Sequence, residues 1–291
     1  MDKLQLKAYG KINLGLDVIR KRPDGYHDLD MIMQMVDVYD DIIIEKKAGE
    51  EIVVKADAAV LSNGKDNLAY MAAKMLFDEF GIKSGVEITI HKRIPIAGGM
   101  AGGSSDCATT LIGINEMFNL GLSKQQLMER GVKLGADVPY CIMRGTVLAE
   151  GIGEELSVLP AMPKCTVLIA KPPISVSTKM VYEALDSKEI VEHPDIDGIL
   201  EGLRKGDLHK VADSMGNVLE DVTIPMHPVI ADIKKVMQDC GAIGAMMSGS
   251  GPTVFGLFEN RASAREAQRM IRDKGLTRQA YVTNIHNVRR K

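Results

Sequence analysis

The sequence "PIAGGMAGGSSD" at residues 95–106 has four glycines within six positions, between a strand-like run and a helix-like run. Glycine lets a bulky anion approach the backbone, and the first amides of a helix are unpaired donors at the positive end of its dipole. An isolated glycine pair would favour the alternative, a flexible turn or a tight helix–strand contact. Because the pairs are repeated and followed by two hydroxyl residues, the run predicts a phosphate-binding loop.

The commoner phosphate loops do not fit this run. A Walker loop requires a lysine directly after its second glycine, whereas Gly103 is followed by Ser104. A dinucleotide fingerprint requires Gly-x-Gly-x-x-Gly, a spacing that the sequence lacks, and the protein-kinase signatures are missing as well. The loop is therefore expected to belong to a different nucleotide-binding fold.

The composition is that of a globular enzyme. The chain has 291 residues, of which 45% are hydrophobic and 26% charged, so two domains with a sizeable core are expected. A net charge of −3 gives no general attraction to nucleic acid or to an anionic membrane. No signal peptide or long apolar span is recognisable, which predicts a cytoplasmic protein.

Cysteine and histidine spacing argues against a protein-built transition-metal site. The four cysteines, at 107, 141, 165 and 240, are far apart in apolar surroundings and are expected to be buried free thiols. The six histidines never approach a zinc-like spacing.

The first ninety residues predict a mostly antiparallel sheet interrupted by one helix at 67–81. Asn67 is expected to cap this helix and Gly81 to end it. Its core-facing stripe is predicted to consist of Leu68, Met71, Ala72, Met75 and Leu76.

Two further helices are expected after the glycine run, at 106–120 and 122–137. In the second, Ser123 and Gln126 have the spacing of a capping box, and Gly135 stands where a helix would stop. The segment "PAMPK" at 160–164 is the best candidate for a domain boundary. Beyond it, helices at 177–185, 227–241 and 262–275 and strands at 166–173, 244–258 and 281–288 predict an α+β arrangement.

Three motifs resemble those of the GHMP kinases (galactose, homoserine, mevalonate and phosphomevalonate kinases). The glycine run is similar to their nucleotide loop, "KINLGL" at 11–16 to their N-terminal motif, and "MSGSGPTVFGLF" at 247–258 to their C-terminal glycine motif. The resemblance implies the α+β two-domain GHMP kinase fold. It has a ribosomal protein S5 domain 2-like N-terminal domain, expected at 1–160, and an α/β-plait C-terminal domain, expected at 161–291.

The resemblance also implies which residues bind ATP. The loop would wrap the phosphates, with helix amides as donors, and magnesium would arrive bound to the nucleotide rather than in a dedicated cage of acidic residues. The residues assigned to ATP by the resemblance are Pro95, Ile96, Ala97, Gly98, Gly99, Met100, Ala101, Gly102, Gly103, Ser104 and Ser105.

In this family an Asp and a Lys flank the acceptor alcohol, and the matching positions are Asp137 and Lys11. Phosphoryl transfer needs mainly alignment and charge stabilisation, which a carboxylate and an ammonium can supply. An ordinary Asp, with a pKa of about 3.9, would accept the proton only late in the reaction. Taken alone, Asp137 could instead end a helix and Lys11 could be a solvated strand-edge residue.

"RPDGYHDL" at 22–29 resembles one branch of the family, whose acceptor is a cytidine diphosphate-linked methylerythritol. The resemblance implies that His27 hydrogen-bonds the cytosine edge while Tyr26 and Tyr182 stack on the ring, which is how proteins read an unpaired base. Pro-Asp-Gly is also a turn signature, and both interpretations are compatible. Asn13 and Thr178 would line the acceptor site, with Gly249 and Gly251 as weaker candidates.

Some residues depart from the family pattern. Ala97 and Ala101 stand where many relatives have glycine, and Asp106 where many have Asn or Ala; alanine costs little unless a positive φ is required. Val218 in "NVLE" at 217–220 replaces an acidic residue.

The expected activity is ATP-dependent phosphorylation of a small alcohol, with no nucleic-acid, membrane or obligate protein partner. The alternatives are another GHMP kinase and a non-catalytic nucleotide or metabolite sensor.

Overall fold

The computed structural model describes residues 2–58, 64–188, 190 and 192–288, which divide into two compact units. The first unit consists of Met1–Gly10, Val38–Ile96 and Ala101–Arg144. The second unit consists of Lys11–Asp37, Ala97–Met100 and Gly145–Lys291. The long strands β1 (Lys3–Lys21) and β2 (His27–Lys47) contribute to both units, and the glycine run is itself divided between them. A boundary between sequence domains at residue 160 stays a prediction.

The first unit contains a sheet in the order β3-β4-β2-β1, with β3 at Ile52–Ala56 and β4 at Gly85–His91. Strands β2 and β4 pair antiparallel from Asp41↔His91 to Lys47↔Gly85. Strand β3 joins β4 in parallel. This sheet is rich in β-branched residues on its covered side, such as Ile42, Ile44, Ile88 and Ile90, all fully buried.

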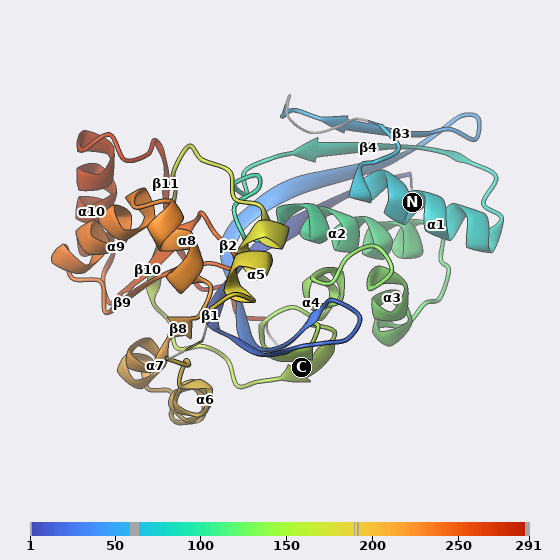
Figure 1. Ribbon diagram of the computed structural model, residues 1–291. Coiled ribbons are helices and arrows are strands. Elements are labelled where there is room, and N and C mark those ends of the chain that lie inside the picture. Colours follow the sequence, from blue (N-terminus) through green and yellow to red (C-terminus); the bar gives the residue numbers. More distant parts are fainter. Residues whose placement is uncertain (1, 59–63, 189, 191, 289–291) are drawn as a thin grey trace. The chain divides into compact units, whose positions relative to one another are not determined.

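Helices α1 (Leu68–Phe80) and α2 (Gly102–Met117) lie on one face of this sheet (Figure 1). Helices α3 (Lys124–Gly131) and α4 (Val138–Met143) pack against α2. Gly113 brings α2 close to the sheet, because a Cβ there would lie 2.4 Å from Ile44 Cδ1. Helix α2 therefore packs tightly against the sheet. Its first turn begins at Gly102, within the glycine run.

The predicted ends of helix α1 are confirmed, and of its predicted core residues Ala72 and Leu76 are buried while Leu68 and Met75 are half-buried. The Asn67 side chain accepts a hydrogen bond from the Ala69 amide, and Gly81 has the left-handed conformation. Met71, however, is 39% exposed. The buried residues are Ala69, Ala72, Ala73, Leu76 and Phe77, because small alanines let α1 pack closely against α2.

Helix α3 has the predicted capping box between Ser123 and Gln126. It ends at Gly131 rather than at Gly135, since the next residues form turns and a separate short helix, α4, follows. Pro139 stands in the first turn of α4, where a missing amide costs nothing. Asp137 thus begins a helix rather than ending one.

The second unit pairs parts of β1 and β2 with β5 (Thr146–Gly151), β6 (Glu155–Val158) and the short strand β8 (Gly216–Asn217). Strands β2 and β5 run antiparallel, and β8 lies parallel to β1 with Gly15 opposite Gly216. A Cβ at Gly15 would lie 2.6 Å from Ile196 Cδ1, so this glycine seats the helix pair α6 (Ile196–Lys205) and α7 (Leu208–Ser214).

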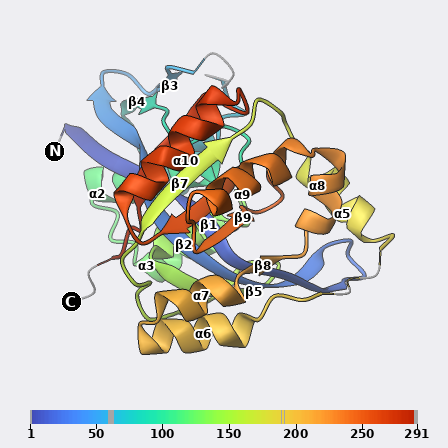
Figure 2. The same cartoon turned by 90° about the vertical axis from the view of Figure 1, so that its left-hand side faces the viewer.

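A second sheet of four strands has the antiparallel order β11-β7-β10-β9. Its strands are β7 (Thr166–Lys171), β9 (Gly244–Met247), β10 (Val254–Phe258) and β11 (Gln279–Asn284). Helices α9 (Val229–Asp239) and α10 (Arg261–Asp273) lie over it (Figure 2). Two helices complete the unit, α5 (Thr178–Leu185) and α8 (Glu220–Met226). The α+β class is confirmed, whereas α6, α7 and α8 were not predicted.

Three cysteines, Cys107, Cys141 and Cys165, are buried free thiols as predicted, and Cys240 is only half-buried. Burial raises the pKa of both Cys107 and Cys165 to about 12, so these thiols are inert. In the described ranges, no helix combines the length and the apolar character that crossing a membrane requires.

Candidate active site

The first turn of α2 is built to receive an anion. Its N-cap, Ala101, makes no side-chain capping bond, and the first turn contains no acidic residue. The amides of Gly102, Gly103 and Ser104 come first in a helix of 16 residues, where no preceding carbonyl can pair with them. The positive end of this helix therefore fits the phosphates of a nucleotide.

The glycine run adopts left-handed backbone at three positions: Ala97 (φ 50°), Gly99 (φ 72°) and Ala101 (φ 56°). Glycine accepts this conformation freely, whereas alanine is strained by roughly 1–2 kcal/mol. Ala97 and Ala101, the two expected departures from the family pattern, thus stand at positions with a positive φ. Strain of this kind concentrates at functional loops.

Within the second unit, Gly99 is pressed against the C-terminal glycine motif. The Ser248 hydroxyl donates to the Gly99 carbonyl at 3.0 Å, and a Cβ on Gly99 would lie 2.1 Å from the Ser248 carbonyl oxygen. Only glycine fits here. Among the other loop residues, Pro95, Gly98 and Met100 are buried and Ile96 is half-buried.

In the first unit, the amide and the hydroxyl of Ser105 both donate hydrogen bonds within the protein. The Ser105 amide donates to the Ala101 carbonyl at 2.8 Å, and its hydroxyl donates to the Tyr9 carbonyl at 2.8 Å. Ser105 thus anchors α2, and its contact with ATP stays a prediction. A Cβ on Gly135 would lie 3.7 Å from Ser104 Oγ, so the turn leading to Asp137 packs beside the first turn of α2.

Asp106, an expected departure from the family pattern, belongs to a buried cluster of charged residues. Lys92 Nζ lies between two buried carboxylates, 2.5 Å from Asp40 Oδ2 and 2.7 Å from Asp106 Oδ2. Burial raises the pKa of Asp106 to about 8, although Lys92 opposes the shift, and Asp40 adds to it. A protonated Asp106 relieves the repulsion between its carboxyl group and that of Asp40. The cluster ties the strand before the glycine run to α2.

Lys11 is buried in the second unit among the other family motifs. Its ammonium donates to Asn13 Oδ1 at 2.8 Å, and its amide donates to the Met100 carbonyl at 3.1 Å. A Cβ on Gly249 would lie 3.7 Å from Lys11 Nζ. The N-terminal motif, the glycine run and the C-terminal motif therefore meet around this lysine. Lys11 and Asp137 belong to different units, and their pairing stays a prediction.

Two residues of "NVLE" hold the C-terminal glycine motif. Asn217 Nδ2 donates to the carbonyls of Met247 and Gly249 at 2.9 and 2.8 Å, and Glu220 Oε1 accepts from the Met247 amide at 2.7 Å. Sequence reasoning did not assign these roles. Val218 is buried and apolar at the second position of this motif.

Thr178, at the start of α5, shares a 2.8 Å hydrogen bond with the Ser250 hydroxyl. Gly249 and Gly251, both with positive φ, flank Ser250. The turn at 248–251 thus lies next to Lys11 on one side and to α5 on the other.

His27 and Tyr182 lie together, with ring centroids 4.9 Å apart and a 32° angle between their planes. His27 is buried, and its Nε2 lies 2.7 Å from Asp186 Oδ1. Asp186 Oδ2 accepts from Lys21 at 2.6 Å. Tyr26 is 61% exposed. Asp186 was missed by sequence reasoning because its partners are 159 and 165 residues away.

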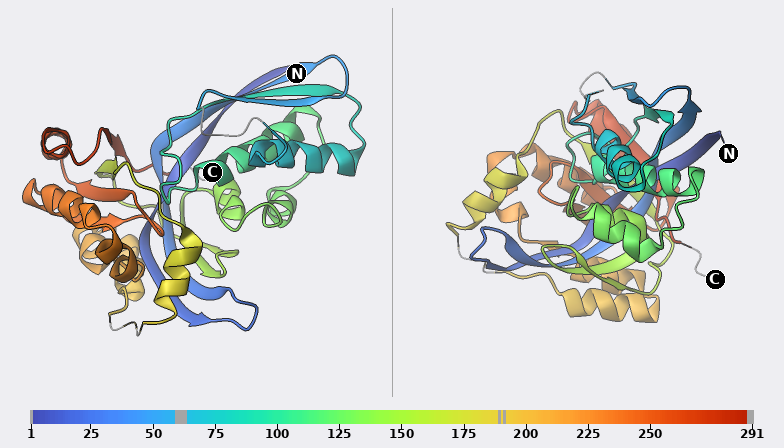
Figure 3. Two further views of the ribbon diagram at one scale, coloured as in Figure 1. Left: turned by 45° about the horizontal axis from the view of Figure 1, so that its top comes forward. Right: turned by 90° about the vertical axis from the view of Figure 1, so that its right-hand side faces the viewer.

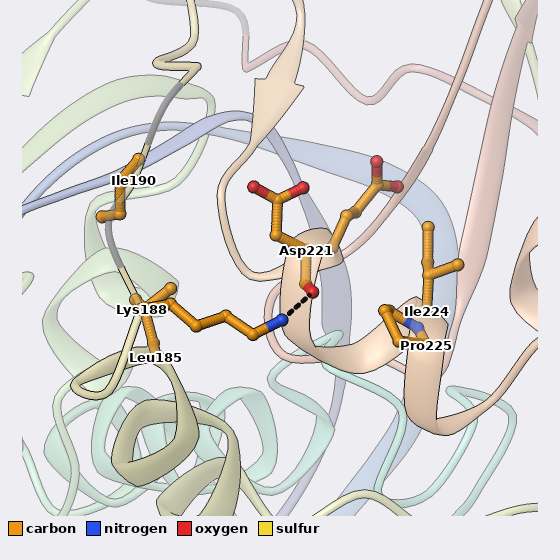
Figure 4. A pocket seen from close by; sticks show the side chains of 7 residues that line it. Leu185, Lys188, Ile190, Asp221, Ile224 and Pro225 are labelled. Atoms are coloured by element: carbon orange, nitrogen blue, oxygen red, sulfur yellow. Dashed lines mark hydrogen bonds between the residues drawn. The ribbon is translucent and has the colours of Figure 1, made fainter.

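A pocket of about 490 Å³ opens between α5 and α8 (Figure 4). Lys188 donates across it to the Asp221 carbonyl at 2.8 Å. Its lining contains none of the predicted site residues. The described ranges contain no cluster of three His, Cys, Asp or Glu residues placed to hold a metal ion.

Comparison with known proteins identifies the family. Residues 67–145 match the GHMP kinases N terminal domain and residues 199–276 match the GHMP kinases C terminal model, together more than half of the chain. The chain belongs to the GHMP kinases. This GHMP kinase is therefore an ATP-dependent phosphotransferase acting on a small molecule.

Full-length relatives share one name, 4-diphosphocytidyl-2-C-methyl-D-erythritol kinase. The protein from Lachnospira eligens is 53% identical over 97% of this GHMP kinase and 98% of its own length. The one from Lachnoclostridium phytofermentans is 54% identical over 92% of both chains. A crystal structure of 4-(cytidine 5'-diphospho)-2C-methyl-D-erythritol kinase, 30% identical, superposes with a TM-score of 0.84 over 98% of this chain and 100% of the other.

Proposed function

We propose that the chain transfers the γ-phosphoryl group of ATP to the 2-hydroxyl of 4-diphosphocytidyl-2-C-methyl-D-erythritol, giving the 2-phosphate and ADP. The observation that carries this proposal is His27 held beside Tyr182, in a chain whose relatives at 53 and 54% identity bear that kinase name. Mevalonate and homoserine have no base to read, so a buried histidine against an aromatic ring serves a cytidine-bearing acceptor better.

The proposed roles follow from charge and position. The first amides of α2 bind the phosphates, and the ammonium of Lys11 stabilises the charge that spreads over the transferring group. Asp137 orients the acceptor hydroxyl and takes its proton late in the transfer. Asn13 fixes the Lys11 ammonium through the 2.8 Å hydrogen bond and lines the acceptor site with Thr178.

The first turn of α2, with its uncapped amides, fits the phosphate end of ATP. We propose that Mg²⁺ enters bound to the ATP phosphates, where it neutralises charge during transfer, because magnesium keeps several waters and few protein ligands. Tyr26 and Tyr182 are proposed to stack on cytosine. Independence from other partners and a cytoplasmic location are kept as predictions.

A coupled ADP-release assay with Mg-ATP and three alcohols tests the proposal: the diphosphocytidyl substrate, mevalonate and homoserine. Turnover of the first, at a kcat/KM at least about a hundredfold above the others, is expected because binding energy at the cytidine end is lost with the other two. Turnover of mevalonate or homoserine alone would assign the chain to another member of the family.

A further inference from the structure

The hairpin between β1 and β2 lies beside α5 (Figure 3). One carboxylate, that of Asp186, joins them. Asp186 accepts from Lys21, on β1, with one oxygen and bonds His27, on β2, with the other. The distances are 2.6 and 2.7 Å. Asp186 therefore joins the end of α5 to two consecutive strands that lie 159 and 165 residues earlier in the chain.

Helix stability does not explain an acidic residue at this position. Asp186 is the C-cap of α5, at the negative end of the helix dipole, where a carboxylate is unfavourable and a lysine or arginine is preferred. The cost is offset by its two partners. Hydrogen bonding by Lys21, and then by His27, lowers the pKa of Asp186, so it stays ionised.

An ionised carboxylate only accepts hydrogen bonds, so the imidazole nitrogen that faces it must carry hydrogen. Asp186 faces Nε2 of His27. In a neutral imidazole with hydrogen on Nε2, the other nitrogen, Nδ1, is a pure acceptor. Packing against Tyr182 at 4.9 Å limits rotation of the His27 ring, which keeps this assignment in place.

An acceptor at Nδ1 distinguishes two pyrimidines. Cytosine presents an exocyclic amine as a donor, whereas uracil presents a carbonyl oxygen, an acceptor, at the same ring position. We propose that Asp186 is a positioning residue that fixes the tautomer of His27 and thereby selects cytosine over uracil. This inference rests on the proposed function, in that His27 reads the base of the acceptor.

Replacing Asp186 by Asn keeps the size of the side chain but removes its control over the tautomer of His27. The amide has the size of the carboxyl group, but it can face Nε2 with either its oxygen or its nitrogen, so both tautomers become allowed. Asp186→Ala removes the partner outright. The matched control is Glu183→Gln on α5, whose carboxylate is 60% exposed and paired only with Lys179 at 3.8 Å in the described chain.

Two measurements apply to the full-length protein. Two-bond ¹H–¹⁵N correlation of the His27 ring reports the tautomer without any ligand, and titration with CDP and with UDP reports base preference. We expect hydrogen on Nε2 and a preference for CDP in the wild type. In Asp186→Asn the tautomers mix and the preference falls roughly tenfold, the value of one hydrogen bond. Glu183→Gln changes neither, and the Kd for ATP stays constant in all variants.

The outcomes separate the inference from the proposed function. Hydrogen on Nδ1 in the wild type, no preference for CDP, or an unchanged preference in both Asp186 variants would overturn the inference. A folded wild type with the expected tautomer and CDP preference, but without turnover of the diphosphocytidyl substrate, would support the inference and reject the proposed function. Circular dichroism of Asp186→Ala and Asp186→Asn establishes that both variants are folded.

Discussion

Ser248 donates a hydrogen bond to the carbonyl oxygen of Gly99, 3.0 Å away, and leaves no room for a side chain on that glycine. Gly99→Ala would place a Cβ 2.1 Å from the Ser248 carbonyl oxygen and would strain a backbone with φ 72°. We expect a loss of about 2 kcal/mol or more in unfolding free energy. Urea unfolding measures this loss, and the KM for ATP should rise with it.

Gly103→Ala is the control for this variant. Its Cβ would lie 3.5 Å from Leu68 Cδ1, an ordinary contact, and the residue lies within α2. Alanine in a helix is favoured over glycine by about 0.5–1 kcal/mol, so stability should not fall. Equal destabilisation by the two substitutions would contradict the close approach of Gly99 and Ser248.

Asn217→Ala tests the support of the C-terminal glycine motif. The substitution removes hydrogen bonds to the Met247 and Gly249 carbonyls and to the Leu219 amide, and leaves them buried without their partner. A loss of about 3 kcal/mol is expected, together with a lower kcat, because Gly249 lies against Lys11.

Asn115→Ala provides the comparison, since Asn115 makes a similar pair of bonds to Leu122 away from the predicted site. It should destabilise the protein by about 2 kcal/mol while kcat stays unchanged. If kcat fell equally in both variants, the effect of Asn217 would be one of general stability.

Asp106→Asn should remove a pH dependence of stability. The pKa of Asp106 is about 8 in the folded protein, against an ordinary 3.8. Between these values the folded state binds more protons than the unfolded chain, so the unfolding free energy falls as pH rises, by about 1.4 kcal/mol per unit. Above the folded pKa this contribution is constant. Parallel stability curves for wild type and variant would show that Asp106 ionises normally.

Asp137→Asn tests the assignment of the proton acceptor. The amide keeps the shape of the carboxylate but cannot take a proton, so kcat should fall by about 10²–10⁴-fold while the Kd for ATP changes little. Calorimetric titration with ATP and the coupled assay measure the two quantities. Asp239→Asn, at an exposed site paired with Lys235, is the control. Loss of ATP binding would instead assign Asp137 a structural role.

Local signals made parts of the fold predictable. The caps of α1 and α3 depend on residues within three positions of each other, so Asn67 and Ser123 could be assigned from the sequence. Ala72 and Leu76 were predicted correctly for the core face of α1, whereas Ala69 and Ala73 were missed, because they become core residues only through the approach of α2. The end of α3 at Gly131 depends on where α4 begins, and Gly135 alone could not indicate it.

In the candidate site, too, residues within local motifs could be predicted, whereas residues with distant partners could not. The glycine run and the resemblance in "KINLGL" and "DGYH" predicted the phosphate loop, Lys11 and His27. The residues that hold them in place, Asn217 and Asp186, act on partners 30 or more positions away and have no local signature. The positive φ at Ala97 and Ala101 was likewise not predicted, since alanine, unlike glycine, gives no signal of a left-handed backbone.

Phosphorylation of one hydroxyl of a cytidine diphosphate-linked alcohol can be followed by ³¹P NMR of a complete reaction with Mg-ATP. We expect a new phosphomonoester signal equal in amount to the ADP formed, with the substrate diphosphate intact and no signal in Asp137→Asn. ADP formation without the monoester, or cleavage of the diphosphate, would contradict it.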